Sequence, residues 1–261
     1  MRALAAIVLA LAVTAAGCDG NDEEHPRPAP TGEAIQIDGG VATPYGRDAG
    51  RVWIIAPTSG ETENVVVYLH GWGARLPFEW HQAWFEHLLR GGSTVVFPEY
   101  QDGANDAWIV APYDLRDGLR RGFRALGDIE VPVVAAGFSV GATLAFVYAA
   151  KAHGWGVPAP RSVYGIFPVD PFQVDPTLDL SGLRKTRVVL LVGDRDNVAG
   201  RFGADALVDN LGSRPAQLLD YRVVRTTNAL LADHEAPTYV DDPDVRTAFW
   251  KPLDELVADV R

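Results

Sequence analysis

One serine in this chain has the surroundings of an activated nucleophile. Residues 137–141 read Gly-Phe-Ser-Val-Gly, after an apolar run at 131–136 and before a helical pattern that begins near Ala142. Small residues on both sides allow a sharp turn from strand to helix, which exposes the hydroxyl of Ser139 at the edge of a sheet. The helix N-terminus offers free N–H groups that stabilise negative charge on a reacting oxygen. The pattern predicts nucleophilic chemistry at Ser139.

A second motif supplies a candidate hydrogen-bond donor for that chemistry. Residues 70–73 read His-Gly-Trp-Gly, directly after an apolar run at 65–69. An oxyanion hole needs one backbone N–H from the residue after the nucleophile and another from a neighbouring loop. We therefore assign the amides of Trp72 and Val140 to this role. We expect His70 to hold the loop, not to act as a base.

Two aspartates compete for the role of the acid that orients a catalytic histidine. Residues 193–196 read Gly-Asp-Arg-Asp and follow the apolar run at 187–192. A carboxylate at a strand end can reach a histidine on a neighbouring loop and fix its tautomer. The geometry of a triad favours Asp196. The alternative is Asp194, which we expect instead to cap the turn or face solvent.

His234 is the predicted general base. It follows the last apolar run, 221–226, by a short loop, and it completes the chain order Ser, Asp, His. That order is the one expected when the nucleophile lies on a strand-to-helix elbow. His81 and His87 lie six residues apart, about 120° around a helix axis, which is wrong for two metal ligands on one face. With a single cysteine in the chain, we predict no metal site and no cofactor.

The elements that must position these residues are short apolar runs separated by helical patterns. The runs cover residues 52–56, 65–69, 94–98, 131–136, 162–169, 187–192 and 221–226, and the helical patterns cover 80–88, 115–126, 142–150 and 247–260. The middle runs are apolar at consecutive positions, as in strands buried on both faces. We predict an α/β fold with a mostly parallel, doubly wound sheet of about eight strands and helices on both faces.

These motifs together resemble the α/β-hydrolase superfamily over nearly all of residues 34–261. The resemblance implies the α/β-hydrolase fold, a Ser-His-Asp triad and activity on esters or related acyl compounds. In that superfamily the acid usually lies three residues after a glycine like Gly193, which selects Asp196. Phe138 stands where many secreted polyester hydrolases and lipases have His. Residues 170–186 are too few for a cap domain, as in dienelactone-hydrolase-like and cutinase-like members.

The N-terminus has the pattern of an export signal. Arg2 precedes an apolar run at 3–16 that is too short to span a bilayer as a mature helix. The run ends Ala-Ala-Gly-Cys at residues 15–18, which resembles a bacterial lipobox, with Ala15 where Leu is usual. We therefore expect a signal peptide over 1–17, lipidation of Cys18 and anchoring to a membrane of the bacterial cell envelope. The alternative is an ordinary cleaved signal peptide with a chance cysteine.

Composition limits the partners and the remaining functions. Residues 18–33 are rich in acid, Pro and Gly and predict a flexible tether before a catalytic domain over 34–261. The formal net charge of −11 disfavours nucleic acid as a partner, because phosphate binding needs an excess of Lys and Arg. The expected activity is hydrolysis of a small-molecule or lipid-like ester. Acyl transfer, amide cleavage or a non-catalytic binding role on the same fold remain alternatives.

Overall fold

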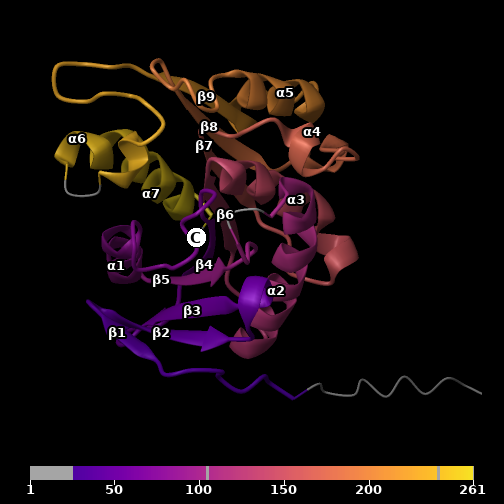
Figure 1. The fold of residues 1–261 in the computed structure, drawn as a ribbon, viewed down its shortest axis with the longest axis vertical. Coiled ribbons are helices and arrows are strands. Elements are labelled where there is room, and N and C mark those ends of the chain that lie inside the picture. Colours follow the sequence, from indigo (N-terminus) through magenta and orange to yellow (C-terminus); the bar gives the residue numbers. More distant parts are fainter. Residues whose placement is uncertain (1–25, 104–105, 240–241, 261) are drawn as a thin grey trace, which may run out of the picture.

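The consecutive apolar runs form the centre of a nine-stranded sheet in the computed structural model, which describes residues 26–103, 106–239 and 242–260 (Figure 1). The strands are β1 Ile35–Ile37, β2 Gly40–Tyr45, β3 Val52–Pro57, β4 Asn64–Leu69, β5 Ser93–Pro98, β6 Val133–Phe138, β7 Ser162–Ile166, β8 Arg187–Gly193 and β9 Leu219–Val224. The helices are α1 Gln82–Arg90, α2 Ala111–Leu126, α3 Val140–Trp155, α4 Pro171–Val174, α5 Phe202–Leu211, α6 Pro243–Val245 and α7 Lys251–Ala258.

The sheet is parallel except at one side. Its order is β1-β2-β3-β5-β4-β6-β7-β8-β9, with antiparallel pairing from β1 to β5 and parallel pairing from β5 through β9. The carboxyl ends of the parallel strands therefore meet at one edge, which we call the carboxyl edge. The segments that follow β4, β5, β6, β7, β8 and β9 all begin there, and this is where ligands bind in open α/β sheets.

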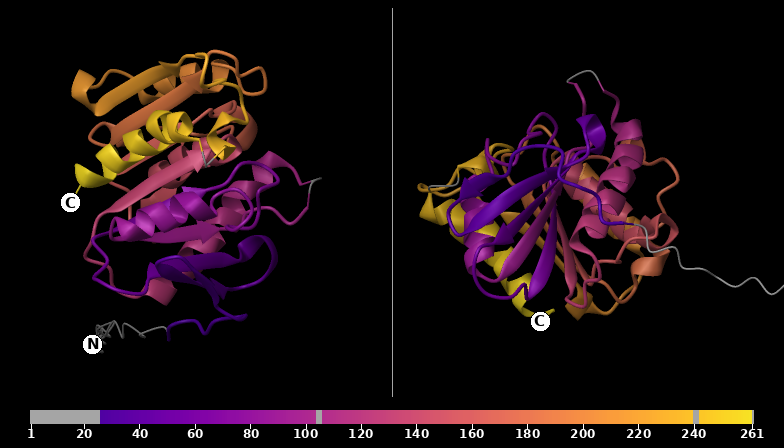
Figure 2. Two further views of the ribbon diagram at one scale, coloured as in Figure 1. Left: turned by 90° about the vertical axis from the view of Figure 1, so that its left-hand side faces the viewer. Right: turned by 90° about the horizontal axis from the view of Figure 1, so that it is seen from below.

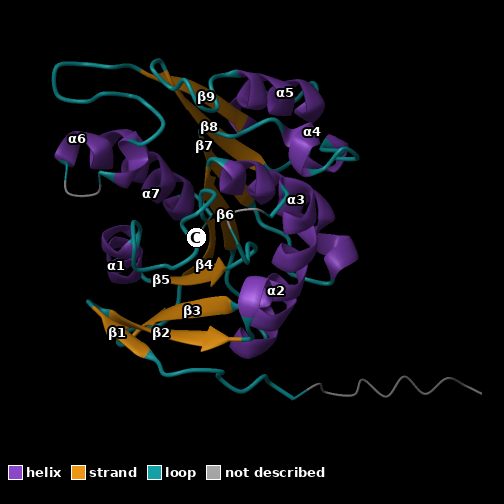
Figure 3. Ribbon diagram, in the orientation of Figure 1, coloured by secondary structure: helices purple, strands orange, loops and turns teal. Residues whose placement is uncertain are grey.

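Two apolar cores cover the two faces of the sheet. Alternate residues of each strand point to opposite faces, so that Val65 and Val67 join one core while Val66 and Tyr68 join the other. Helices α2, α3, α4 and α5 lie on one face, and α1, α6 and α7 lie on the other (Figures 1 and 3). Views from two further sides show the same layered arrangement (Figure 2). The prediction of a mostly parallel α/β sheet with helices on both faces is confirmed.

The structure differs from the sequence prediction in detail. Strands β1 and β2 were not among the predicted runs, because β1 has only three residues and β2 is buried only at alternate positions, so neither forms a run of consecutive buried apolar residues. The run at 162–169 ends as a strand at Ile166, since Phe167 has a φ of 54° and turns the chain away. The C-terminal helical pattern begins with a π-helical turn at Arg246–Trp250 before α7.

The N-terminal features fall mostly outside the described residues. The signal peptide over 1–17, Cys18 and the tether up to residue 25 are not described, so their roles stay predictions. Residues 26–33 are described, and the backbone N–H of Thr31 donates to the carbonyl oxygen of Pro44 at 2.9 Å. Within the described ranges, none of the helices has both the length and the apolar character needed to cross a bilayer.

Candidate active site

The nucleophile elbow predicted at residues 137–141 has the expected backbone geometry. Ser139 has a φ of 57° between the end of β6 and the first turn of α3. A Cβ at Gly137 would overlap the backbone of Gly141, and a Cβ at Gly141 would overlap the carbonyl oxygens of Leu69 and His70. Only glycine permits these close approaches, and a positive φ at a serine is strain of the kind found at functional sites.

Three segments bring the predicted Ser, His and Asp into one hydrogen-bonded chain. The Oγ of Ser139 lies 3.0 Å from the Nε2 of His234, and the Nδ1 of His234 lies 3.1 Å from the Oδ2 of Asp196. Because a carboxylate only accepts, Nδ1 carries the proton and Nε2 is free to accept from the serine hydroxyl. The three residues are 7–8% exposed, so this chain lies just beneath the surface at the carboxyl edge.

The two competing aspartates have separate partners. Asp196 has a fully buried side chain, and its Oδ1 accepts from the amides of Val198 at 2.8 Å and Ala199 at 3.0 Å. Burial raises the pKa of the Asp196 carboxyl, but His234 and the two amides outweigh this effect and hold it below its usual value. Asp194 instead accepts from the amide and hydroxyl of Thr226, at 2.9 and 2.8 Å. Only Asp196 contacts the histidine.

Two phenylalanine rings pack against the imidazole ring of His234. The Phe138 ring centroid lies 5.0 Å from that of His234, and the Phe167 centroid lies 5.9 Å from it. Phe167 is fully buried and also packs edge-to-face on Phe249. Phe138 therefore packs against the histidine predicted to act as the base. No sequence pattern indicated Phe167, because its contact with His234 depends on the turn after β7.

The loop after β4 has a fixed orientation that bears on the predicted oxyanion hole. The carbonyl oxygen of Gly71 accepts from the Nδ1 of His70 at 2.7 Å and from the amide of Ala74 at 3.1 Å. In a trans peptide the next N–H points the opposite way, so the amide of Trp72 is directed away from these donors. A Cβ at Gly71 would lie 3.6 Å from the Cβ of Ser139, so this peptide lies beside the predicted nucleophile.

The other predicted donor begins a helix. Val140 is the first residue of α3, where backbone N–H groups have no acceptor within the helix. In the parts of the chain that the structure describes, neither the Trp72 amide nor the Val140 amide donates to a protein acceptor. Both N–H groups are therefore free to bind an oxygen atom of a ligand.

His70 is packed as a structural residue, as predicted. It is fully buried, its ring stacks on Tyr100 at 4.1 Å, and the Tyr100 hydroxyl donates to its carbonyl oxygen. Burial lowers the pKa of His70 to about 4 despite the hydrogen bond to Gly71, so the ring is neutral at pH 7. Its Nδ1 carries the proton, because the carbonyl of Gly71 can only accept.

Gln101 was not predicted as a site residue, although it supports the same loop. Its side chain is 2% exposed, its Oε1 accepts from the amide of Gly73 at 2.8 Å, and its Nε2 donates to the carbonyl of Gly103 at 2.8 Å. Its position three residues after the apolar run at 94–98 could have indicated Gln101 as a site residue. Polar residues at such strand ends face the ligand edge of an α/β sheet.

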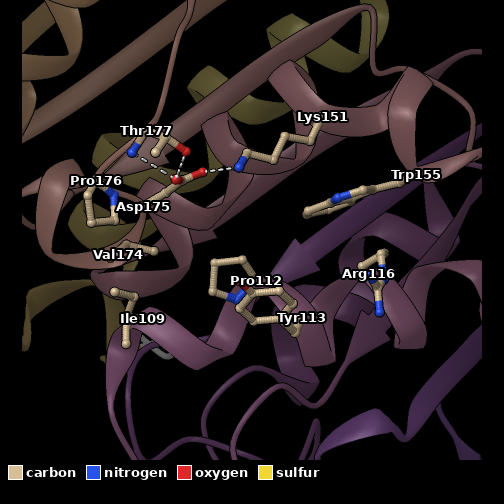
Figure 4. A pocket seen from close by; sticks show the side chains of 10 residues that line it. All are labelled: Ile109, Pro112, Tyr113, Arg116, Lys151, Trp155, Val174, Asp175, Pro176 and Thr177. Atoms are coloured by element: carbon tan, nitrogen blue, oxygen red, sulfur yellow. Dashed lines mark hydrogen bonds and ion pairs between the residues drawn. The ribbon is translucent and has the colours of Figure 1, made fainter.

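A separate cavity lies on the outer side of α3. It has a volume of about 320 Å³, and its walls include Tyr113 of α2, Trp155 of α3 and Val174 of α4 (Figure 4). Lys151 and Asp175 form an ion pair of 2.5 Å along its upper wall. The Ser, His and Asp described above do not line it. Among the residues described, no group of three or more His, Cys, Asp or Glu is arranged to hold a metal ion.

Comparison with known proteins relates the fold to solved esterases. No protein-family model matches the chain, and no curated protein matches it. A carboxyl esterase from the fungus Tuber melanosporum superposes with a TM-score of 0.65 at 15% identity, over 90% of this chain and 91% of that one.

Two bacterial esterases are similar in the same way. Esterase 2 of Thermogutta terrifontis, phosphorylated by paraoxon, has a TM-score of 0.61 at 16% identity, over 86% of this chain and 95% of that one. A thermostable esterase from Pseudomonas putida has a TM-score of 0.59 at 18% identity, over 88% and 82%. With its parallel sheet, its elbow at β6 and these neighbours, the chain has the α/β-hydrolase fold.

Proposed function

We propose that this protein is a serine hydrolase of carboxylic esters that acts through Ser139, His234 and Asp196. The observation that carries the proposal is the continuous hydrogen-bonded chain from the Ser139 hydroxyl through His234 to the buried Asp196 carboxylate. Esterases of the same fold support ester bonds as the target. The roles proposed for Ser139, His234 and Asp196 depend on the geometry of these hydrogen bonds alone.

The proposed reaction begins with attack by Ser139 on the ester carbonyl carbon. The hydroxyl proton moves to the Nε2 of His234 as the new C–O bond forms, and the Asp196 carboxylate stabilises the resulting imidazolium. The carbonyl oxygen becomes an oxyanion, which accepts hydrogen bonds from the amides of Trp72 and Val140.

The acyl-enzyme then forms and is hydrolysed by the same groups. His234 gives its proton to the leaving alcohol as the C–O bond of the ester breaks. Water next attacks the acyl-serine, His234 accepts a proton from that water, and the same base returns the proton to the Ser139 oxygen as the acid product leaves.

Hydrolysis of p-nitrophenyl esters of increasing acyl length tests the proposal. We expect turnover by the unmodified chain, loss of at least a thousandfold, in order of magnitude, in Ser139→Ala, and labelling of Ser139 by a fluorophosphonate. Equal turnover by both proteins would overturn the proposal. Labelling of Ser139 without ester turnover would point instead to amide cleavage or to acyl transfer to an alcohol. Absence of both would favour a binding protein.

We also propose, from the sequence alone, that the exported protein is lipidated at Cys18 and held at a membrane of the bacterial envelope. The support is the order of a charged start, an apolar run and a lone cysteine after small residues. Growth in labelled palmitate should label the unmodified chain but not the Cys18→Ala variant. Label that persists in that variant would overturn this proposal.

A further inference from the structure

The exposed apolar side chains of this protein are concentrated at the carboxyl edge. Of the eleven large apolar residues exposed in the described ranges, all but Ile35 lie in a segment that follows a parallel strand or in the first helical turn after it. They are Leu76, Trp80, Ile109, Val110, Tyr113, Phe172, Val198, Phe202, Leu231 and Tyr239. We call this set the carboxyl-edge face. These segments make up a minority of the chain. On an ordinary surface, exposed apolar side chains would be scattered singly over all parts of the chain, which is not the distribution here.

This set is built on the same segments as the proposed catalytic groups. Val198 is 73% exposed, yet its amide donates to the Oδ1 of Asp196 at 2.8 Å. Leu231 is three residues before His234 and is 54% exposed. Apolar side chains thus project to solvent from the loops that hold the acid and the base.

The cavity of Figure 4 extends the apolar surface on the side of α2. Ile109 and Tyr113, 49% and 63% exposed, belong to the carboxyl-edge face and also line that cavity. Val174 and Pro176 line it as well. The exposed apolar surface therefore continues into a hollow of ligand size, whose walls also carry the charged side chains of Arg116, Lys151 and Asp175.

The charges around these side chains are mostly negative. The described segments that follow the parallel strands carry four arginines, Arg75, Arg195, Arg201 and Arg225, and no lysine. Eight acids that are not buried accompany them: Glu79, Asp102, Asp106, Asp170, Asp194, Asp233, Glu235 and Asp242. An excess of acid repels an anionic lipid surface, whereas it does not oppose contact with an uncharged apolar phase.

We propose that the carboxyl-edge face docks onto uncharged, water-insoluble acyl esters, so that Ser139 takes its substrate from an apolar phase and not from solution. This inference rests on the proposed ester hydrolysis and names the substrate class for it. Contact with the apolar phase buries exposed side chains on the same loops as Asp196 and His234, and so brings ester groups toward Ser139.

The test compares an emulsified ester with a soluble one. The substrates are tributyrin, taken through its solubility limit, and p-nitrophenyl acetate in solution. We expect the tributyrin rate to rise further once droplets form, and the ratio of emulsion to solution activity to fall on the order of tenfold in Phe202→Ser/Leu231→Ser. The matched control is Ile35→Ser, which removes an exposed apolar side chain on β1 and should leave the ratio unchanged.

Adsorption provides a readout that does not require turnover. Protein carrying Cys18→Ala and Ser139→Ala is mixed with triolein droplets, with and without Phe202→Ser/Leu231→Ser, after thermal melting has shown that each variant is folded. We expect less protein to adsorb to the droplets when it carries Phe202→Ser/Leu231→Ser. We expect Ile35→Ser to leave the adsorbed amount unchanged.

The outcomes separate the two proposals. A tributyrin rate that follows only the dissolved ester, equal adsorption of the face and control variants, or stronger adsorption to droplets coated with anionic lipid would each overturn the docking proposal. Adsorption that depends on Phe202 and Leu231, without hydrolysis of either ester, would support the docking face and refute ester hydrolysis.

Discussion

The backbone N–H of Gly73 donates to the Oε1 of Gln101 at 2.8 Å and so joins the loop after β4 to the loop after β5. Gly73 has a φ of 99°, a conformation that the sequence allows but does not hold by itself. The peptide one residue earlier carries the Trp72 amide assigned to the oxyanion. In the proposed mechanism, Gln101 therefore acts as a positioning residue for that amide.

Replacement of Gln101 by Leu should reduce kcat about tenfold and leave KM nearly unchanged, because the loop loses its orientation while the substrate still binds. Steady-state kinetics on a soluble ester measures the split. The control is Gln82→Leu, since the exposed Gln82 side chain donates to Glu86 on the same helix, away from the site. A raised KM with an unchanged kcat would contradict the positioning role.

The two aspartates near His234 should differ sharply in their effect on turnover. Asp196→Asn should lower kcat by about a thousandfold or more, because an amide in place of the carboxylate no longer stabilises the imidazolium or enforces its tautomer. Asp194→Asn removes only an exposed contact to Thr226 and should keep activity within about threefold. Equal losses in the two variants, measured with the same ester, would refute the assignment of the acid.

A methyl group at Gly141 should destabilise the protein, and the same change later in the same helix should not. The Cβ of Gly141→Ala meets the carbonyl oxygens of Leu69 and His70, so strand β4 must shift and unfolding becomes easier by about 2 kcal/mol or more. Gly154→Ala is the control, because its Cβ meets no atom within 4 Å and alanine favours a helix by up to about 1 kcal/mol. Urea denaturation of both variants measures the difference.

Acid should weaken the fold through two buried histidines. Burial lowers the pKa of His70 to about 4 and that of His81 to about 3, whereas both titrate near 6.5 when unfolded. As the pH falls below about 6.5, the unfolded chain binds protons that the folded chain does not, so the free energy of unfolding decreases toward pH 4.

The histidine contribution can be separated by substitution. Free energies of unfolding measured at pH 7 and pH 5 should differ less in His81→Phe, which keeps a ring against Phe85 and Phe97 but cannot titrate. The exposed His153→Gln is the control and should keep the full difference. An unchanged difference in His81→Phe would show that other groups cause the acid sensitivity.

Local patterns in the chain were enough to predict the strands and helices and the order of the residues with chemical roles. Consecutive apolar residues in runs such as 65–69 require strands covered on both faces, because such strands have no face that water could wet. Glycines at 137 and 141 around a serine, between a strand and a helix, require a tight elbow. These are local properties, and the chain alone carries them.

Which of the predicted residues come into contact depends on how the strands and helices pack together. The sequence favoured Asp196 over Asp194, but only the turn after β8 places Asp194 against Thr226 and Asp196 against His234. The packing of Phe167 against His234 and the support of Gly73 by Gln101 join residues 67 and 28 positions apart along the chain. Such contacts depend on how neighbouring strand ends converge at one edge, which local sequence patterns do not encode.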